Sequence, residues 1–405
     1  MGERAVCHLN IVGFRAAVAA VKDKSLRGKP YVIAGTSGSR ALALDCSREA
    51  IKQGITPGMV LAAAQRLVKD LMILSPDPPA YEAMNKEIET VAARYAPVWE
   101  NDRAGNLYLD ITGTKGLFGP STDCSSRVLR DIFEKTEITP AAAVACNKLV
   151  SKVATRTIRP IGLIQVHAGT EAEFLSHQYI QFLPGMGPGL LKTAIVTGIK
   201  EIGEIATLSI PEALSIFGKR GALLRAMAQG IDDSRVTEGF REKRIIKQAD
   251  FNEDMIDETA IRGAITTLVE YAGLEMRNEK LGMSCLRLRV VYSDGVEAQG
   301  FERAKRLLIT DNEITKTAFG IFNKIVNRRL RIRSIGLCFE DLNHLDFQPD
   351  LFEPESESKD KRLQDAVDKI QNRYGAGTVI KGMVLAAMKA QNGTQLLTAG
   401  TGYAY

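Results

Sequence analysis

The stretch Ala5–Ala20, AVCHLNIVGFRAAVAA, decides the fold because it joins a buried strand directly to a helix. Its first half, Ala5–Val12, is apolar and predicts a buried strand, and the alanines and valines from Ala16 onward predict a helix. A strand-to-helix junction of this kind often carries catalytic carboxylates. The end of this strand instead offers Asn10 and Val12, and neither side chain holds a divalent cation as a carboxylate does.

The segment His8–Ala19 resembles the opening of the Y-family DNA polymerases, the DinB/UmuC-type lesion-bypass enzymes. That family opens with a hydrophobic strand in which two acids flank one residue, followed by aromatic residues and an A-x-V-E motif. The family's metal-binding Asp corresponds here to Asn10, its ribonucleotide-excluding aromatic to Arg15 and its final Glu to Ala19. The resemblance therefore implies the scaffold of such a polymerase without the chemistry of this strand.

A second block that resembles the family spans Ser47–Met59, with a predicted helix over Ser47–Gln53. In the family this block holds the incoming triphosphate. The nucleotide-contacting Tyr and Arg correspond to Arg48 and Ile51, and an isoleucine cannot pair with a phosphate. Arg48 and Lys52 are the remaining candidates for nucleotide binding; the alternative is a solvated helix face.

Residues 97–112 predict a β-hairpin that contains the family's second metal-binding motif, S-x-D-E-A-Y-L-D. When the motif is aligned on Tyr108-Leu109-Asp110, its two metal-binding acids correspond to Gly105 and Asn106. Asp110 is kept, but the resemblance implies a structural role for it.

These substitutions remove the ligands that nucleotidyl transfer needs. The reaction uses two metal ions about 3.5–4 Å apart, and magnesium prefers anionic oxygen ligands. Asparagine supplies one neutral oxygen, glycine only its backbone and valine nothing. We therefore expect no catalytic residue, no bound metal and no cofactor. The alternative is a displaced site for magnesium or manganese, for which the candidate ligands are Asp45, Glu100, Asp102 and Asp110.

Two further blocks follow the order of the family. Asn147–Ala154 resembles the motif N-K-x-x-A-K-x-A and places Lys152 where the family has a triphosphate-contacting lysine, although a lone helical lysine is usually just solvated. Leu183–Pro188 and the helix after it resemble a helix-hairpin-helix. Its glycine turn, formed by Gly185, Met186 and Gly187, would bring backbone N–H groups to a DNA phosphate. The alternative is a generic turn between two helices.

Residues 241–342 predict the order strand, helix, strand, strand, helix, strand, which resembles the little-finger domain that straddles the DNA backbone. Alternation places two arginines on one face of the second strand, and two on one face of the last strand. The alternative is a solvent-facing sheet with ordinary charges. The predicted DNA-binding residues here are Arg287, Arg289, Arg303, Lys305, Arg306, Arg331 and Arg333.

The region after this domain contains two short features. Gln348–Phe352 resembles the peptide by which bacterial polymerases bind the sliding clamp, with Gln348, Asp350, Leu351 and Phe352 as predicted contacts and a departure at Pro349. Residues 361–373 predict an amphipathic helix that resembles the C-terminal ends of UmuC-type chains.

Length and composition limit the number of domains, the kind of partner and the cellular compartment. A length of 405 residues favours several domains, and a formal net charge of +5 permits a polyanionic partner without requiring one. The 6 cysteines show no C-x-x-C spacing, which indicates reduced thiols in a cytoplasmic protein, and the resemblance implies a bacterial one. No apolar run is long enough to span a membrane.

The blocks together predict an α+β fold with the right-hand Y-family architecture. The expected domains are a palm (1–10 and 75–165), fingers (11–74), a helical thumb (166–240), a little finger (241–342) and a tail (343–405). The expected function is that of a catalytically inactive member, similar to the ImuB-type subunit of mutagenic repair complexes, in translesion synthesis during the SOS response.

The expected partners are primer-template or damaged DNA and the sliding clamp. The resemblance also implies an error-prone polymerase and a RecA-like protein. Two other functions stay open, an active polymerase with a relocated metal site and a regulatory binder that blocks bypass.

Overall fold

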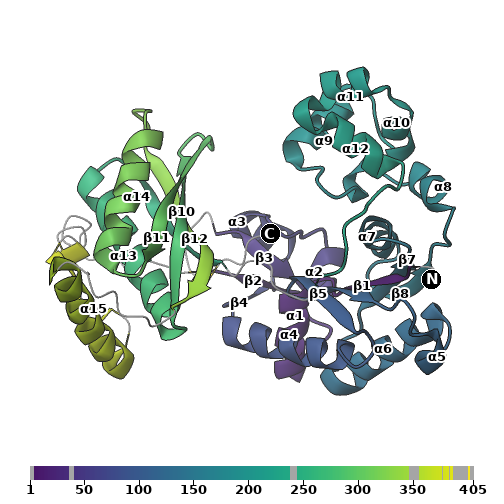
Figure 1. Cartoon of the computed structure of the whole chain (residues 1–405), viewed down its shortest axis with the longest axis horizontal. Helices are drawn as coiled ribbons and strands as arrows, with labels where there is room; N and C mark the ends of the chain where they lie inside the picture. The colour runs from purple at the N-terminus through teal and green to yellow at the C-terminus, as the bar shows by residue number, and fades with distance from the viewer. Residues whose placement is uncertain are drawn as a thin grey trace. The chain divides into compact units, whose positions relative to one another are not determined.

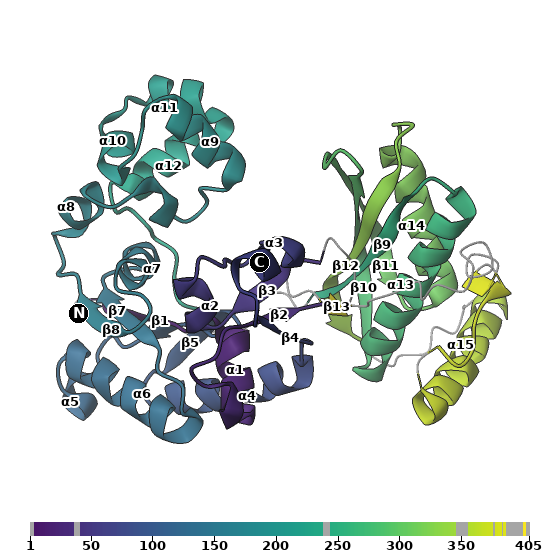
Figure 2. The same cartoon turned by 180° about the vertical axis from the view of Figure 1, so that it is seen from behind.

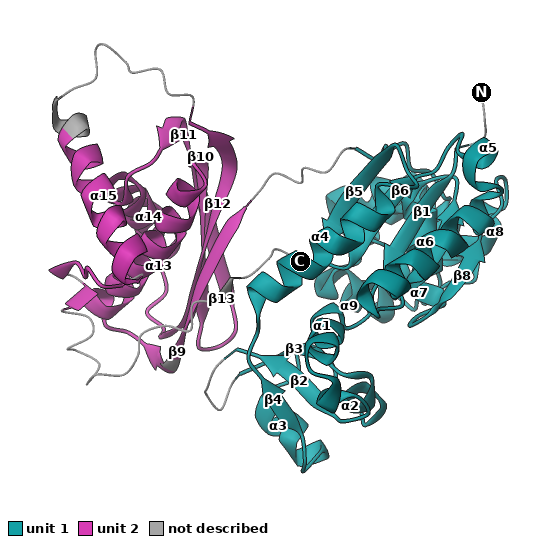
Figure 3. Ribbon diagram, turned by 90° about the horizontal axis from the view of Figure 1, so that it is seen from below, with its two compact units in different colours: residues 1–241 teal, residues 242–405 magenta. Residues whose placement is uncertain are grey.

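The computed structural model describes residues 4–35, 41–237, 244–345, 355–375, 377–382, 384–385 and 400–401. The chain forms two compact units, Met1–Arg241 and Glu242–Tyr405 (Figures 1 and 3). The boundary between them falls one residue after the predicted start of the little finger. In these described ranges, no helix has the length and apolar character that a bilayer crossing requires.

The first unit is built on a five-stranded sheet with β1 at its centre (Figures 1 and 2). Its strands, in spatial order, are β5 (Val98–Arg103), β6 (Asn106–Asp110), β1 (Val6–Asn10), β7 (Ala141–Ala145) and β8 (Gly162–Gln165). All of β1 is buried, as its apolar sequence predicts, and it pairs antiparallel with both β6 and β7.

The two faces of this sheet differ in chemistry. Cys7 and Leu9 of β1 join an apolar core with α4 (Pro78–Ala92) and α6 (Ser121–Thr136) on one face. The alternate residues His8 and Asn10 lie on the opposite face, which is covered by α7 (Lys148–Thr157). The period of two in the strand thus places polar groups under α7.

A small mixed sheet and three helices follow β1. The sheet has the order β3 (Ala43–Cys46), β2 (Tyr31–Ala34) and β4 (Met72–Leu74). The helices are α1 (Phe14–Lys22), α2 (Arg48–Lys52) and α3 (Leu61–Leu67), and the 3₁₀ turn η1 (Lys24–Leu26) follows α1. Ser47 caps α2 by accepting a hydrogen bond from the amide of Ala50, which explains why the helix begins at this point.

Short helices complete the first unit. They are α5 (Lys115–Phe118), α8 (Glu171–Ser176), η2 (Ile180–Phe182), α9 (Pro188–Val196), α10 (Ile202–Thr207), α11 (Ile210–Phe217), η3 (Gly218–Arg220) and α12 (Gly221–Ala228). All but α5 belong to the predicted thumb. Helices α11 and α12 pack so closely that a Cβ at residue 221 would lie 2.0 Å from the carbonyl oxygen of Ala213. Only glycine permits this approach.

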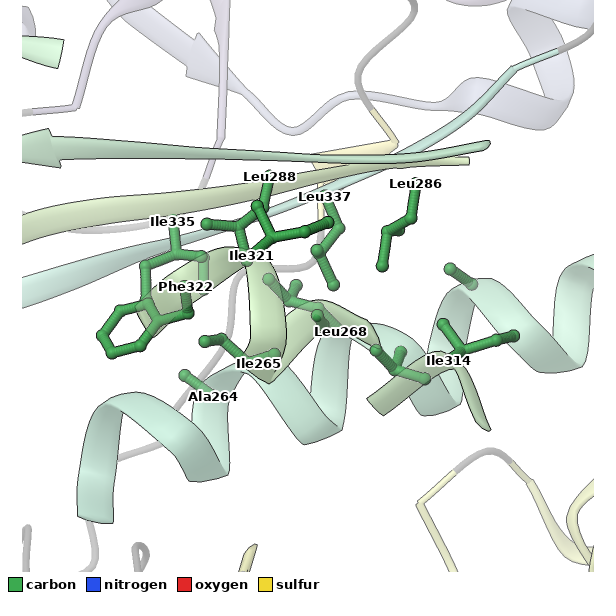
Figure 4. Packing of buried hydrophobic residues seen from close by; sticks show 14 of the residues in the cluster. Ala264, Ile265, Leu268, Leu286, Leu288, Ile314, Ile321, Phe322, Ile335 and Leu337 are labelled. Atoms are coloured by element: carbon green, nitrogen blue, oxygen red, sulfur yellow. The ribbon is translucent and has the colours of Figure 1, made fainter. Parts of the chain in front are cut away.

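The second unit is an antiparallel sheet covered on one face by two helices, and Figure 4 shows the apolar side chains between these layers. Its strands, in spatial order, are β11 (Glu297–Leu308), β10 (Leu281–Tyr292), β12 (Ile332–His344), β9 (Ile245–Met255) and β13 (Gly400–Thr401). The helices are α13 (Glu258–Asn278) and α14 (Asp311–Ile325). The predicted strand–helix order of this unit matches the structure. Helix α14 begins at Asp311 because Thr310 and Glu313 form a capping box.

A further helix, α15 (Glu355–Tyr374), begins six residues before the predicted helix at 361 and contacts α13 and α14. Asp368 of α15 accepts hydrogen bonds from Arg277 of α13 at 2.5 and 2.9 Å. Gln364 of α15 donates to Asp311 of α14 at 3.1 Å. Helix α15 therefore adds to the helical side of this unit.

Candidate functional site

The candidate site is the polar face of the five-stranded sheet beneath α7. Strand register places Asn10 opposite Asn106, and His8 opposite Tyr108. The next strand places Glu100 opposite Tyr108. We call this surface the polar face; it consists of His8, Asn10, Glu100, Asp102, Asn106, Tyr108, Lys148 and Lys152. Asn10 and Asn106 on this face occupy two of the positions where the resemblance places metal-binding acids.

Two amides occupy these positions. Asn10 and Asn106 are 2% and 4% exposed, and Asn10 Nδ2 donates a hydrogen bond to Asn106 Oδ1. Asn106 Nδ2 lies 3.5 Å from the carbonyl oxygen of Ala104. Two buried carboxylates at this distance would repel each other unless a cation lay between them, whereas two amides stabilise each other directly. The hydrogen bond thus joins two uncharged amides, while Asn10 Oδ1 is buried and has no hydrogen-bond partner among the described residues.

The third position, Gly105, cannot hold a carboxylate in this backbone. Its φ is +75°, and an ideal Cβ would lie 2.8–2.9 Å from atoms of the Phe14 side chain. The Gly105 amide donates to Asn85 Oδ1 at 2.9 Å, and its carbonyl accepts from the amide of Ile11 at 2.8 Å. An aspartate would need another backbone conformation and a displaced Phe14. The residues at these three positions do not fit a pair of divalent metals.

Asp45, the first candidate for a relocated metal site, supports the start of α1. That helix has Gly13 as its N-cap, which offers no side chain. The Asp45 carboxylate instead accepts from the amides of Arg15 at 2.9 Å and Ala16 at 3.4 Å, and from its neighbour Cys46 at 2.9 Å. Burial raises the pKa of Asp45, while these amide hydrogen bonds oppose that rise.

The acids of β5 form ion pairs with α7. Glu100 accepts from Lys148 at 2.7 Å through both carboxylate oxygens, and Asp102 accepts from Lys152 at 2.7 Å. Lys148 Nζ also lies 4.9 Å from the ring centre of Tyr108. Because the lysines are four residues apart on a helix and the acids two apart on a strand, both pairs cross the polar face side by side.

These pairs leave little for a metal to bind. The remaining candidate, Asp110, accepts a hydrogen bond from the amide of Thr112 at 3.0 Å. Within the described part of the chain, no three His, Cys, Asp or Glu side chains gather closely enough to hold a metal ion. The candidate acids are thus dispersed, and each is bonded to protein groups.

The three predicted nucleotide-binding residues lie on two helices, α2 and α7. Arg48 and Lys52 are exposed on α2. Lys152 is bonded to Asp102, and burial lowers its pKa despite the opposing effect of that carboxylate. For the residues that the structure describes, no hydrogen bond or ion pair joins Arg48 or Lys52 to Lys152. Val12, the last of the degenerate positions, is half-buried in the turn before α1.

The predicted glycine turn of the thumb precedes α9. Gly185 is exposed with a φ of +87°, Met186 packs partly into the helical core, and Gly187 is the N-cap of α9. Arg220 Nη1 lies 3.5 Å from the Gly185 carbonyl oxygen. The element before the turn is the short 3₁₀ helix η2 rather than an α-helix, and the helix-hairpin-helix stays a prediction.

The predicted basic residues of the second unit are mostly bonded to acidic side chains. Arg287 donates to Glu340 at 3.1 and 3.0 Å through two nitrogens, and this pairing lowers the pKa of Glu340. The other pairs are Arg289–Glu297, Arg303–Asp341 at 2.8 Å and Arg306–Glu313 at 2.6 Å. Arg331 lies 3.5 Å from the carbonyl oxygen of Asp254, Arg333 bonds the carbonyl oxygen of Ser293, and Lys305 is exposed. These acidic partners offset part of the positive charge that the basic residues alone would give to the surface of this unit.

Several features were not foreseen. The ion pairs of the polar face join residues about fifty positions apart, so local pattern gives no signal for them. Phe301, an exposed aromatic ring among the basic residues of β11, was also missed. Its position in a strand with alternating basic residues is a sequence signal that could have identified it.

The predicted clamp contacts Gln348, Asp350, Leu351 and Phe352 lie outside the described residues.

Comparison with known proteins now identifies the family. The impB/mucB/samB family model matches residues 9–156, and the model of that family's C-terminal domain matches residues 242–351. Together they span more than half of the chain. The chain belongs to the Y family of DNA polymerases. The first match lies within the first compact unit and the second within the second unit, while the division of the first unit into palm, fingers and thumb stays a prediction.

Relatives named DNA polymerase IV align with most of the chain. The DNA polymerase IV of Desulfatibacillum aliphaticivorans is 26% identical over 382 residues, covering 94% of this chain and 96% of the relative. That of Halorhodospira halophila is 28% identical over 291 residues, covering 72% and 82%.

Solved structures show the same fold. A Dbh–Dpo4 Y-family polymerase chimera superimposes with a TM-score of 0.74 at 21% identity, covering 84% of this chain and 100% of the chimera. DinB from Sulfolobus solfataricus gives a TM-score of 0.58 at 21% identity, with the same coverage.

Proposed function

We propose that this chain is a Y-family protein without polymerase activity that binds primer-template or damaged DNA and the bacterial sliding clamp. It acts as an accessory protein in translesion synthesis during the SOS response, comparable to the ImuB-type subunit. The observation that carries the proposal is the Asn10–Asn106 amide pair beside Gly105, whose backbone leaves no space for a side chain.

Loss of the metal site supports the first part of the proposal. Two-metal catalysis needs carboxylates that bridge the ions, and the polar face offers amides in their place. The remaining acids serve the protein itself, since Asp45 caps α1 and Asp102 pairs with Lys152. A relocated metal site would have to break several of these bonds.

The relatives support DNA as the partner, because the similar proteins are named DNA polymerases. The glycine turn before α9 offers uncapped helix amides, and the little finger offers exposed basic side chains. The clamp remains an expectation from Gln348–Phe352. An error-prone polymerase and a RecA-like protein remain expectations from the ImuB-type resemblance.

Primer extension tests the proposal. Purified protein is given a primed template with Mg²⁺ or Mn²⁺, and DNA binding is measured in parallel as salt is raised. We expect binding that weakens steeply with salt, and no extension. Extension that disappears in the Asp45→Asn, Asp102→Asn or Asp110→Asn variant would instead identify a relocated metal site and an active polymerase.

A restoration variant sharpens this test. Asn10→Asp combined with Asn106→Glu restores two ligands, and we expect no extension because Gly105 still supplies none. Adding Gly105→Asp supplies the third carboxylate, but we expect this variant to be less stable, because the new side chain would overlap with Phe14.

A cellular experiment separates a recruiter of polymerases from a blocker of bypass. Deleting Gln348–Phe352 should reduce damage-induced mutagenesis if the chain recruits an active polymerase to the clamp. The same deletion should increase mutagenesis if the chain blocks bypass, so the sign of the change decides between them.

A further inference from the structure

Among the described residues of the second unit, no helix covers the face of the sheet opposite α13 and α14. Ala298 and Ala304 of β11 pack toward the helices, and a Cβ at residue 300 would lie 2.6 Å from the side chain of Ile325 in α14. The even-numbered residues of this part of β11 therefore face α14. The odd-numbered residues point to the other side, which we call the open face.

Phe301 lies on this open face and is 62% exposed. It is paired in register with Arg287 of β10, whose guanidinium carbon lies 5.1 Å from the centre of the Phe301 ring. Arg287 is itself held by two hydrogen bonds to Glu340. One side of the ring is thus contacted by a fixed cation, while much of the ring remains accessible to solvent.

The neighbours of Phe301 favour a nucleic-acid ligand over an apolar protein surface. The next outward positions on β11 are Gln299, Arg303 and Lys305, all exposed, and Arg289 lies across from Gln299 on β10. Three of these neighbouring arginines, counting Arg287, are paired with acids, but the basic side chains with Gln299 around an exposed ring still suit a ligand that carries both a flat ring and a negative backbone.

We propose that Phe301, backed by Arg287, is a stacking platform for an unpaired base of single-stranded DNA. The inference rests on the proposed DNA-binding function and adds a preference for single-stranded template. A duplex keeps both faces of its internal bases stacked on their neighbours, so only an unpaired base can place a face on the ring. The surrounding basic side chains would hold the phosphates on either side of that base.

Competition between two oligonucleotides tests the platform in the full-length chain. One is a single strand of thymidines, and the other is a strand of equal length and charge made of abasic sites. We expect Phe301→Ala to weaken thymidine-strand binding by roughly 5- to 100-fold, the range for one base–aromatic stack, and to leave binding of the abasic strand unchanged. The salt dependence should not change, because no phosphate contact is lost.

Two further variants serve as controls. Phe301→Tyr keeps the ring and should bind both strands as the parent does. Ile256→Ala removes another exposed apolar side chain of the same unit, which lies in the short connection between β9 and α13, and should change neither affinity.

Equal losses on the two strands, or no loss on the thymidine strand, would overturn the platform while leaving DNA binding in place. Failure of the unmodified chain to bind any DNA would overturn the platform and the proposed function together, and that result appears before any variant is made.

Discussion

Residue 105 decides which chemistry the hairpin between β5 and β6 can support. Its φ of +75° is open to glycine but strained for aspartate, and the space where a side chain would begin is taken by Phe14. Asn10 and Asn106 then form the amide pair that replaces a carboxylate cluster. The residues at the three positions are mutually consistent, because each lacks a negative charge that would repel the others in the absence of a cation.

Gly105→Ala tests this fit. We expect it to lower the free energy of unfolding of the first unit by roughly 2–4 kcal/mol, through left-handed backbone strain and overlap with Phe14. The measurement is urea unfolding followed by the fluorescence of Trp99, the single tryptophan of the chain.

Gly113→Ala is the matched control, because Gly113 also has a positive φ, +78°, but has open space around it. It should lose only the strain of the backbone, about 1 kcal/mol. In a Phe14→Leu background the effect of Gly105→Ala should shrink toward that of the control. Equal losses at the two glycines would show that Phe14 does not restrict residue 105.

Burial of His8 predicts that the stability of the first unit depends on pH. His8 is fully buried against Tyr108, and burial, followed by the charge of Lys152, lowers its pKa well below the ordinary value. The unfolded chain takes up a proton below about pH 6.5, while the folded chain does not. Acidification from pH 6.5 to 5.5 should therefore lower stability, by up to about 1.4 kcal/mol per pH unit from this group.

The slope is measured by urea unfolding at several pH values, again by Trp99 fluorescence. His8→Gln should flatten it between pH 6.5 and 5.5, even if stability at neutral pH also falls. His167→Gln changes an exposed histidine of the same unit and should leave the slope unchanged. An unchanged slope in His8→Gln would mean that His8 takes up its proton in the folded state.

At the scale of elements, α15 is held by a buried polar network rather than by its apolar side chains. Arg277 is only 8% exposed and bonds both Asp311 of α14 and Asp368 of α15. Leu363 and Ile370 of α15 remain exposed. Sequence alone predicts the amphipathic helix, whereas its contacts in the structure come from the polar residues Gln364 and Asp368, about 100° around the helix from the apolar residues that precede them.

Asp368→Asn should release α15 from the unit. Loss of one charge-assisted pair weakens docking by about 1–3 kcal/mol, so amide hydrogen exchange within α15 should accelerate roughly 5- to 100-fold. Exchange in β10 and β12 should stay slow. Asp365→Asn makes the same charge change at an exposed position of α15 and serves as the control. A uniform acceleration through the sheet would show that the network supports the whole unit.

The success of sequence reasoning varied with the range of the interactions. The β1 strand, the 97–112 hairpin and the strand–helix order of the second unit follow from local periodicity and turn residues, and all three are observed. The start of α4 also has a local signal, Asp77–Pro78, a cap followed by proline. The pairing of Lys152 with Asp102 had no such signal, because it depends on how α7 crosses β5.

At the scale of the whole molecule, charge is abundant but balanced. The chain has 53 Lys and Arg against 48 Asp and Glu, and the little finger pairs most of its basic side chains with acids. DNA bound on the open face must compete with these internal partners. Its affinity therefore reflects the acids of that face as much as its arginines.

Glu297→Gln tests this competition. Glu297 pairs with Arg289 on the open face, so its neutralisation should free one cation and raise DNA affinity a few-fold at low salt. The slope of log affinity against log salt should steepen by up to about one unit, the value for one added phosphate contact. Glu258→Gln makes the same change of net charge beside Arg262 on α13, away from the open face. If both variants raise affinity equally, DNA responds to net charge alone; a rise in Glu297→Gln only would place the DNA backbone on the open face.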